Sequence, residues 1–317
     1  MLKPKGLFKN KKVAVLMGGP SGEREVSLRS GAAVLKSLQE RGYNAIGVDA
    51  HVDLLSDLKK EKVEVCYNAL HGTYGEDGVV QGLLESARIP YSGSGVSACV
   101  LTMDKVLTKR LLAMQDIPTA EDVVVKKSHV ETNPKVSFSG PYVVKPAREG
   151  SSLGITICDN KSQLPDAIRE AAKFEGDILI EKFIAGRELT VGIVGDAVFP
   201  PVEIVCKNAF YDYQAKYTKG FSQYFCPAEI PDSVTENLSN LALKAYQALG
   251  CRGGARVDFR LDANQNAFVI ELNTSPGMTE LSLLPMGAKA YGLNFADLVE
   301  SILDSAGLEI HIGWSAK

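Results

Sequence analysis

The sequence lacks the features of a secreted, metal-scaffolded or membrane protein. Its six cysteines are Cys66, Cys99, Cys158, Cys206, Cys226 and Cys251, and they form neither a CxxC pair nor any spacing typical of a zinc site. No apolar run approaches the length of a membrane-spanning helix. The basic start is followed by only five apolar residues, Val13 to Met17, too few for a secretion signal. We expect reduced thiols, a cytoplasmic location and no membrane partner.

The chain also lacks an excess of positive charge. Its formal net charge is -3 and its pI is near 5.9, so a basic surface that binds nucleic acid is not expected. A hydrophobic content of 45% and a charged content of 23% are typical of a globular protein. The length of 317 residues indicates two or three domains. The composition therefore favours an enzyme or binding protein with a small-molecule partner.

Three patterns of organisation follow one another along the chain. From residue 13 to about 91, short apolar strands (13–17, 45–48, 63–70) alternate with helical stretches (25–41, 77–87), which predicts a three-layer α/β domain with a parallel sheet. A helix over 103–114 and strands at 122–125, 141–145 and 155–158 predict a smaller α+β domain. Helices over 233–249 and 294–306 and a hairpin indicate a second α+β unit. We place the domains at 1–94, 95–182 and 183–317.

The two common nucleotide-binding motifs are missing. No Walker GxxxxGK[ST] sequence occurs, and the glycines of VAVLMGGPSGEREVSL do not have the GxGxxG spacing. Gly18, Gly19 and Gly22 nevertheless lie between a strand and a helix, where backbone N–H groups can bind an anion, and Asp49 is a loose match to a ribose-binding acid. A tight turn with Glu23 and Glu25 in the first turn of the helix explains the same residues. Both interpretations stay open.

Two later segments favour a nucleotide site of another kind. In PYVVKPAREGSSLGI, an apolar strand carries Lys145 to a loop rich in small residues, which can close over phosphate oxygens. In ILIEKFIAGRELTVGI, Glu181 and Lys182 end a strand and Glu188 follows a turn, so they could hold an adenine amino group or a ribose hydroxyl. Ordinary turns and solvated strand ends are the alternatives.

The segment RVDFRLDANQNAFVIELNTSPG indicates a β-hairpin with acids on one face. Strands over 256–261 and 267–273 flank a turn, and pairing Asp262 with Ala267 sets Asp258 opposite Glu271. The same register sets Arg256 opposite Asn273. Like charges directly opposite each other destabilise a sheet, so a cation is expected between them. Asp258, Glu271 and Asn273 suit magnesium, with Arg256 left to bind an oxyanion. Neutralisation of the acids by Arg256 and Arg260 is the alternative.

Taken together, the motifs resemble those of the D-alanine–D-alanine ligase family of the ATP-grasp superfamily, over about residues 13 to 307. The segments that carry the resemblance occur in the family's order and spacing: GGPSGEREVSLRSG, NALHGTYGEDG, TMDK, VVKPAREGSSLGI, IEKFIAGRELTV, FYDYQAKYTKG, RVDF and IELNTSPGMTELSLLP. The implied fold is a Rossmann-like (pre-ATP-grasp) domain followed by a two-part ATP-grasp fold. The implied reaction joins two D-alanines through D-alanyl phosphate, using ATP.

The resemblance also implies the roles of individual residues. The family's residues that contact the ATP phosphates correspond to Lys105, Lys145 and Lys216. Those that contact the adenine and the ribose correspond to Glu181, Lys182, Phe183, Ile184 and Glu188. The family's ligands of two Mg²⁺ ions, or of Mn²⁺ in their place, correspond to Asp258, Glu271 and Asn273. The residues that match contacts of the two D-alanines are Glu25, His71, Ser282 and Leu283, and those that match the oxyanion site are Arg256 and Gly277. Ser151 and Tyr217 match a pair that links a mobile loop to Glu25.

Some positions differ from many relatives, and these differences keep other second substrates open. Gly254 and Ala255 stand where tryptophan and glycine are frequent, Gln214 where an acid is, and Leu281 where a histidine is. Leu281 could alter the pocket for the second substrate, so D-lactate or D-serine is an alternative. A different carboxylate-amine ligase, a nicotinamide oxidoreductase and a nucleotide-binding regulator are more distant alternatives. The resemblance further implies a homodimer.

Overall fold

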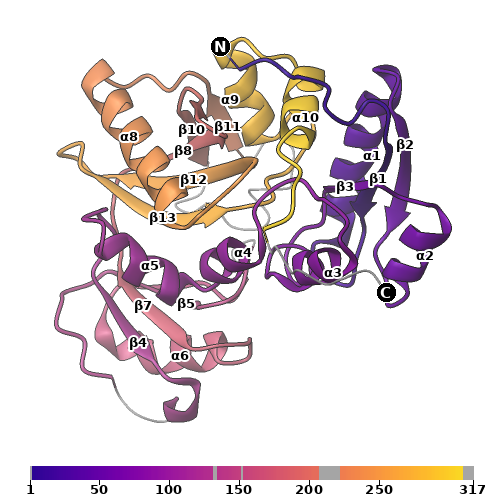
Figure 1. The fold of residues 1–317 in the computed structure, drawn as a ribbon. Coiled ribbons are helices and arrows are strands. Elements are labelled where there is room, and N and C mark those ends of the chain that lie inside the picture. The colour runs from indigo at the N-terminus through magenta and orange to yellow at the C-terminus, as the bar shows by residue number, and fades with distance from the viewer. Residues whose placement is uncertain (1, 131–133, 151–152, 207–221, 310–317) are drawn as a thin grey trace.

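The computed structural model describes residues 2–130, 134–150, 153–206 and 222–309. The first part of the chain forms a parallel sheet of β1 (Lys12–Met17), β2 (Asn44–Asp49) and β3 (Val65–Asn68), in the order β2-β1-β3. Its helices are α1 (Arg24–Glu40), α2 (Leu54–Lys60) and α3 (Val79–Ala87). The predicted three-layer α/β arrangement is confirmed (Figure 1).

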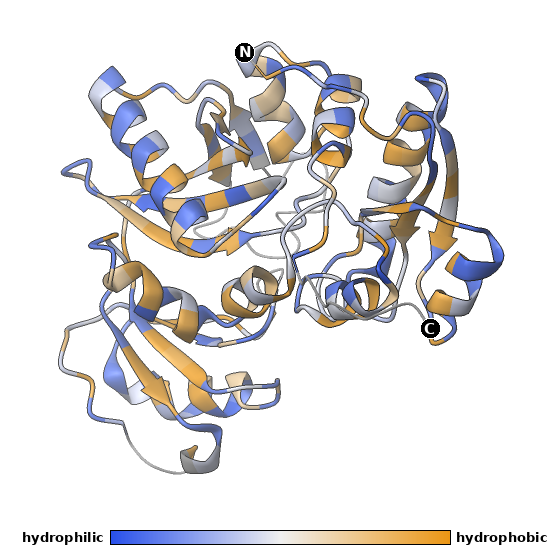
Figure 2. Cartoon of the chain, in the orientation of Figure 1, coloured by the Kyte–Doolittle hydropathy of each residue, from blue (hydrophilic) through white to orange (hydrophobic). Residues whose placement is uncertain are grey.

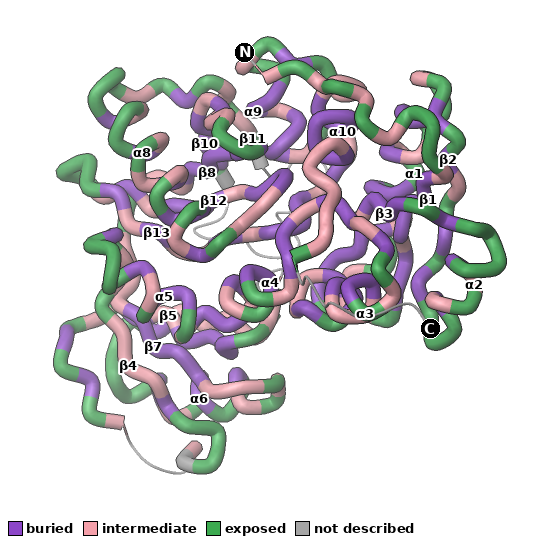
Figure 3. Tube along the Cα trace, viewed as in Figure 1, coloured by how far each residue is buried: buried purple, intermediate pink, exposed green. Residues whose placement is uncertain are grey.

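Strand β1 shows why this sheet is covered on both faces. Val13 and Val15 pack in a cluster with α1, whereas Ala14 and Leu16 pack in a cluster with α2 and α3. Successive side chains of a strand point to opposite faces, so a strand between two helical layers needs a continuous apolar run. The sequence VAVL supplies that run, and all four residues are fully buried (Figures 2 and 3).

The middle of the chain builds an antiparallel sheet in the order β4-β7-β5-β6. Its elements are α4 (Val96–Met103), α5 (Lys105–Ala113), β4 (Asp122–Val125), η1 (Lys127–His129), β5 (Tyr142–Pro146), β6 (Thr156–Cys158), η2 (Lys161–Gln163), α6 (Leu164–Ala171) and β7 (Ile178–Lys182). The predicted helix over 103–114 is shorter than expected, because Asp104 is extended between α4 and α5. Its carboxylate accepts the N–H groups of Val106 and Leu107 and so caps α5.

The last part contains a second sheet in the order β11-β10-β8-β12-β13, with β9 paired to β8. Its elements are β8 (Arg187–Val194), β9 (Ala197–Val198), β10 (Val202–Cys206), β11 (Ser222–Phe225), α8 (Asp232–Ala248), β12 (Gly254–Leu261), β13 (Ala267–Asn273), α9 (Leu283–Tyr291) and α10 (Phe295–Leu303). In Figure 1 the hairpin β12–β13 faces α5 and the middle sheet, so the predicted hairpin lies where two sheets meet.

The first and last parts of the chain share one hydrophobic core. Val34 and Leu38 of α1 belong to the same buried cluster as Val299 and Leu303 of α10. At its edge, Arg41 forms ion pairs with Asp297 and Glu300, and the Tyr43 hydroxyl donates to Glu300. The boundaries at 94 and 182 stay predictions, but the core shows that the part before residue 94 is not packed independently.

The structure bears on the expected reduced thiols and on the expected absence of membrane-spanning helices. Cys66, Cys99, Cys158, Cys226 and Cys251 are free thiols. Among the described helices, none combines the length and apolarity that a membrane span requires.

Candidate functional site

The hairpin places its acids as predicted, although the predicted register is wrong near the turn. Asp258 pairs with Glu271 and Arg256 pairs with Asn273. At the turn, however, Ala267 pairs with Leu261 and not with Asp262. A register shift between Asp258 and Phe259 accounts for the difference, since one extra residue on β13 moves the pairing by one position. The bulge therefore changes the pairing only between itself and the turn, and the pair of Asp258 with Glu271 keeps the predicted register.

Each of these acids has a basic partner. Arg256 donates to both oxygens of Asp258, at 2.8 and 2.9 Å, and Thr190 donates to Asp258 at 2.6 Å. Lys105 Nζ lies 3.4 Å from Glu271 Oε2 and donates to the carbonyl of Glu149. The expectation that Arg256 stays apart from the acids is therefore wrong, because a bidentate pair with Asp258 satisfies its guanidinium. In this respect the structure favours the alternative of neutralised acids.

A buried ion cluster lies behind the hairpin. Glu181 receives Lys145 Nζ on one oxygen and Lys109 Nζ on the other, both at 2.6 Å, and Lys109 also donates to the carbonyl of Ala120. Burial would raise the pKa of Glu181, but the charges of Lys145 and Lys109 outweigh it and lower that pKa. The Glu181 carboxylate is thus held by lysines, and the sequence interpretation missed Lys109. Its spacing of four from Lys105 on one helix face could have indicated it.

These groups line one pocket between the middle sheet and the hairpin. Lys105 and Lys145 lie on one side and Asp258 and Glu271 on the other, so cationic and anionic groups face the same space. Apolar side chains complete the walls. The predicted residues that line the pocket are Lys105, Lys145, Glu181, Lys182, Phe183, Ile184, Glu188, Asp258 and Glu271, and the apolar ones beside them include Ala120, Val143, Ile155, Phe268, Val269 and Ile270.

Arg260 fixes one rim of this pocket. It donates to the carbonyls of Ile184 and Gly186 and to Glu188 at 3.2 Å, and its guanidinium lies over the ring of Phe183. The alternative that Arg260 neutralises the hairpin acids is therefore wrong. Arg260 instead holds the 184–186 turn and Glu188 against the apolar wall.

The glycine turn after β1 does not present an anion site. The N–H of Gly19 donates to Asp49, and Arg24 donates to both oxygens of Asp49. An acid already paired in this way is not available for a ribose. Of the two interpretations of this segment, the structure supports the tight turn.

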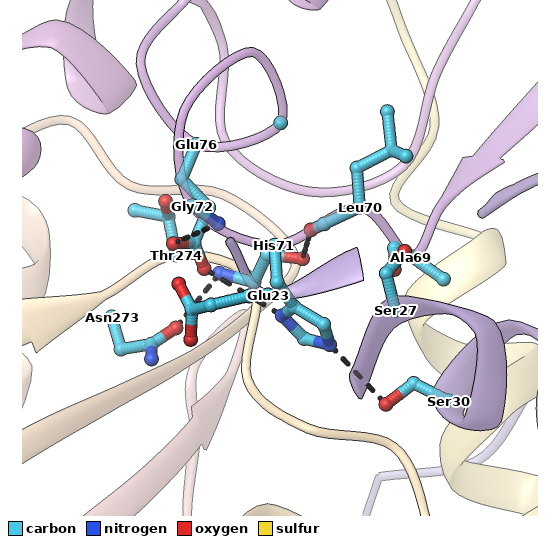
Figure 4. Close-up of polar contacts among 12 residues, drawn as sticks. Glu23, Ser27, Ser30, Ala69, Leu70, His71, Gly72, Glu76, Asn273 and Thr274 are labelled. Atoms are coloured by element: carbon cyan, nitrogen blue, oxygen red, sulfur yellow. Dashed lines mark hydrogen bonds and ion pairs between the residues drawn. The ribbon is translucent and has the colours of Figure 1, made fainter. Parts of the chain in front are cut away.

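At the start of α1 the structure points to Glu23 and not to Glu25. Glu25 is exposed in the first helical turn. A Cβ atom built on Gly72 would lie 2.8 Å from Glu23 Oε2, and one built on Gly150 would lie 3.2 Å from it. Glu23 therefore lies close both to the loop that carries His71, as Figure 4 shows, and to Gly150 in the loop after β5.

His71 is buried beside a second acid. Its Nδ1 lies 3.8 Å from Glu76 Oε1, and its Nε2 lies 3.2 Å from Ser30 Oγ. Burial raises the pKa of Glu76, and the charge of Glu23 raises it further while His71 opposes them. The structure thus brings His71, Glu23 and Glu76 together, and the sequence interpretation named only the first.

The segment after β13 approaches the same region. Ser282 Oγ accepts the N–H of Thr279, and a Cβ atom on Gly277 would lie 3.0 Å from that oxygen. Leu283 packs with Val202 and Ile204, so its side chain is part of a core cluster. Any substrate contact of Leu283 must use its backbone. Ser151, Lys216 and Tyr217 lie outside the described residues.

The donor set at the hairpin fits magnesium. Among the described residues, no group of three or more His, Cys, Asp or Glu side chains could hold a metal by itself. Mg²⁺ typically uses one or two carboxylates and takes its other oxygens from water and phosphate. Asp258 and Glu271, opposed on one face, are such a pair, and Asn273 Oδ1 follows on the same strand.

Comparison with known proteins identifies the family. The family described as D-ala D-ala ligase C-terminus matches residues 111–304, and the one described as D-ala D-ala ligase N-terminus matches residues 51–94. The chain belongs to the D-alanine–D-alanine ligase family. A D-alanine–D-alanine ligase from Geobacter sulfurreducens is 47% identical over 304 residues, covering 96% of each chain. One from Syntrophotalea carbinolica is 47% identical over 301 residues, covering 95% of this chain and 98% of that one.

Solved structures agree with this assignment. A D-alanine–D-alanine ligase from Bacillus anthracis, complexed with ATP, has a TM-score of 0.80 and 31% identity, covering 93% of this chain and 97% of that one. The VanG D-Ala:D-Ser ligase from Enterococcus faecalis has a TM-score of 0.82 and 29% identity, covering 93% and 98%. The fold is therefore that of the family, as expected, with an ATP-grasp arrangement after the first domain.

Proposed function

We propose that this protein joins two D-alanines into D-alanyl-D-alanine, with ATP converted to ADP and phosphate. The observation that carries the proposal is the pocket in which the predicted lysines face the opposed acids Asp258 and Glu271. A phosphate chain needs cations on one side and a magnesium site on the other, and an adenine needs an apolar wall. The lysines, the opposed carboxylates and the apolar wall of the pocket support the proposal, as does the family of ligases to which the chain belongs.

In this proposal the pocket binds the nucleotide. Lys105 and Lys145 contact the phosphates, while Phe183 and Ile184 form the wall beside the adenine and Glu188 holds the ribose. The backbone of Glu181 and Lys182 completes the adenine edge, since the Glu181 carboxylate is held by two lysines. Lys216 is proposed to reach the transferred phosphate.

Asp258, Glu271 and Asn273 are proposed to hold two Mg²⁺ ions, with Mn²⁺ as an alternative. Bound there, the metal supplies positive charge that offsets the charge of the phosphate oxygens. The residues themselves set its position, because the strand pairing sets the two acids opposite each other.

The chemistry proceeds in two transfers. A carboxylate oxygen of the first D-alanine attacks the terminal phosphorus, and ADP leaves. The amine of the second D-alanine then attacks the acyl carbon, the C–O bond to phosphate breaks, and the amine gives up a proton. Arg256 and the backbone at Gly277 are proposed to stabilise the oxyanion, which requires Arg256 to share its N–H groups with Asp258.

The substrate end is proposed to use Glu23 for the ammonium of the first D-alanine. Glu23 replaces Glu25 in this role because Glu23 lies at the His71 and Gly150 loops, while Glu25 is exposed. Ser282 and the backbone of Leu283 are proposed to bind the second carboxylate. Ser151 and Tyr217 are proposed to connect the loops above Glu23.

The decisive experiment measures ADP release and products. The purified protein is supplied with ATP, Mg²⁺ and D-alanine, and we expect D-alanyl-D-alanine and ADP in equal amounts. Parallel samples contain D-alanine with D-lactate or D-serine. A folded protein that forms no dipeptide contradicts the proposal, and a preferred mixed product replaces it with the alternative suggested by Leu281.

We also propose a cytoplasmic homodimer. The location agrees with the free thiols of the described residues, and the dimer follows the resemblance to the family. Analytical ultracentrifugation over a range of concentrations tests the dimer, and a monomer at micromolar concentration contradicts it.

A further inference from the structure

Helix α1 presents two buried hydroxyl groups to the loops around the substrate end. Ser27 and Ser30 are both fully buried and lie three residues apart, hence on one face of the helix. Ser27 Oγ donates to the carbonyl of Ala69 at 2.8 Å. Ser30 Oγ lies 3.2 Å from His71 Nε2 and accepts the N–H of Met278 at 3.1 Å (Figure 4). Within the described ranges of the chain, the Ser27 hydroxyl contacts one other segment, whereas the Ser30 hydroxyl contacts two, the loop of His71 and the loop of Met278.

The hydrogen bonds of Ser30 fix the direction of its proton. Its oxygen accepts from Met278, so its own hydrogen needs an acceptor. In the part of the chain that the structure describes, the one acceptor recorded for it is His71 Nε2. A neutral imidazole accepts at one nitrogen and carries its proton on the other. When Ser30 donates to Nε2, a neutral His71 ring carries its proton on Nδ1, the nitrogen that lies 3.8 Å from Glu76 Oε1.

The other end of this link is the loop over 274–278. Ser275 Oγ donates to the carbonyl of Leu70 at 2.7 Å, and this hydrogen bond connects the 274–278 loop to the His71 loop. The second hydrogen bond runs from the Met278 N–H to Ser30 Oγ, and it fixes the peptide group between Gly277 and Met278. With one hydrogen bond before Gly277 and one after it, the backbone at Gly277 has little freedom to rotate.

We propose that Ser30 is a positioning residue that sets the imidazole of His71 and the backbone at Gly277 relative to each other. The two groups come from loops about 200 residues apart in sequence, and one hydroxyl satisfies both. The inference rests on the proposed function, in which Gly277 serves the oxyanion and Glu23 binds the first D-alanine beside the His71 loop. Loss of the hydroxyl should therefore weaken the use of D-alanine and leave the use of ATP unchanged.

The test compares Ser30→Ala with Ser27→Ala. Both variants remove one buried hydroxyl from the same helix face, but Ser27 contacts only the carbonyl of Ala69 among the described residues. We expect Ser30→Ala to raise the KM for D-alanine about fivefold or more, the scale of one or two neutral hydrogen bonds. The KM for ATP should change less than twofold. Ser27→Ala should leave both constants near wild type.

A second measurement does not depend on activity. The chain has only four histidines, so the ¹⁵N signals of the His71 ring can be assigned with a His71→Gln variant. We expect wild type to carry the proton on Nδ1 and Ser30→Ala to change the Nε2 shift, with no such change in Ser27→Ala.

These outcomes separate the inference from the proposed function. Wild-type protein that forms no dipeptide removes the proposed function, and the ring signals still test the link. Equal KM changes in the two serine variants, or a proton on Nε2 in wild type, overturn the role of Ser30.

Discussion

Glu181 and Glu76 are two buried carboxylates placed in opposite electrostatic settings. Glu181, which lines the pocket between the middle sheet and the hairpin, is held by Lys109 and Lys145, and its pKa is lowered. Glu76, at the substrate end, has only the backbone N–H of Gly72 and the imidazole of His71 beside it, among the contacts described here, and its pKa is raised. The pocket end thus neutralises its buried charge, while the substrate end keeps a buried acid with weaker compensation. Such poorly compensated groups are typical of functional sites.

The largest expected effect comes from Glu271, an acid proposed to hold the metal. Glu271→Gln should lower turnover by about a hundredfold or more, because an amide is a weaker magnesium ligand than a carboxylate. The fold should persist, because Asp258 keeps its pair with Arg256 and Lys105 keeps its hydrogen bond to the carbonyl of Glu149. Steady-state rates at limiting Mg²⁺ check this, with the exposed Glu280→Gln as control. Near-normal activity of Glu271→Gln would contradict the metal assignment.

The next effect separates the structure from the sequence interpretation. Glu23→Gln should raise the KM for D-alanine about 10- to 100-fold, because a charged hydrogen bond is worth about 1.5–3 kcal/mol. Glu25→Gln should change it little, since Glu25 is exposed. Initial rates over a range of D-alanine concentrations decide the matter. The reverse order of effects would restore Glu25 to the role that the resemblance gave it.

A third prediction concerns Lys109, the lysine outside the predicted set. Lys109→Met leaves Glu181 with one lysine, and we expect the free energy of unfolding to fall by about 2 kcal/mol. The KM for ATP should rise, because Lys145 then becomes the only lysine paired with Glu181 among the described residues and is less available to a phosphate. Urea unfolding and ATP kinetics measure the two effects, and Arg110→Met, on an exposed side chain of the same helix, is the control. Unchanged stability would mean that Lys145 alone satisfies Glu181.

The smallest effect is a difference in pH dependence. The lowered pKa of Glu181 means that its stabilisation is present above the ordinary value of 4.5 and is lost as pH falls below it. The raised pKa of Glu76 means that its charge destabilises the fold at neutral pH, and this penalty disappears as pH falls toward 4.5. Glu181→Gln should therefore destabilise the protein at pH 7, whereas Glu76→Gln should stabilise it.

Urea unfolding at several pH values between about 4 and 7 measures both variants. A shift in the same direction for Glu181→Gln and Glu76→Gln would remove the contrast between the two ends of the site.

The groups that could be predicted lie on strands. Alternation along 256–261 and 267–273 places Asp258 and Glu271 on one face, and Lys145 follows an apolar strand. The bulge could not be predicted, because nothing in the turn sequence marks an extra residue on β13. The predicted register still aligned the acids, since the pairing beyond the bulge is the one expected.

The groups that could not be predicted lie on helices or directly before one. Glu23 and Glu25 are two residues apart at a helix that begins at Arg24, and only the structure tells which one faces the site. Ser30 contacts His71 and Met278, which are far away in sequence, so no local pattern reveals the link. Hydroxyl groups also occur on most surfaces, and their partners depend on tertiary packing.

The core shared by α1 and α10 has a consequence for how the chain folds during synthesis. Val34 and Leu38 leave the ribosome more than 250 residues before Val299 and Leu303, their partners in the same cluster. Proteins are made at about 5–20 residues per second, so roughly 10 to 50 seconds pass between the synthesis of the apolar face of α1 and that of α10, which packs against it. During that interval the apolar face of α1 lacks the partner that covers it in the folded protein, and exposed apolar surface of this kind promotes aggregation.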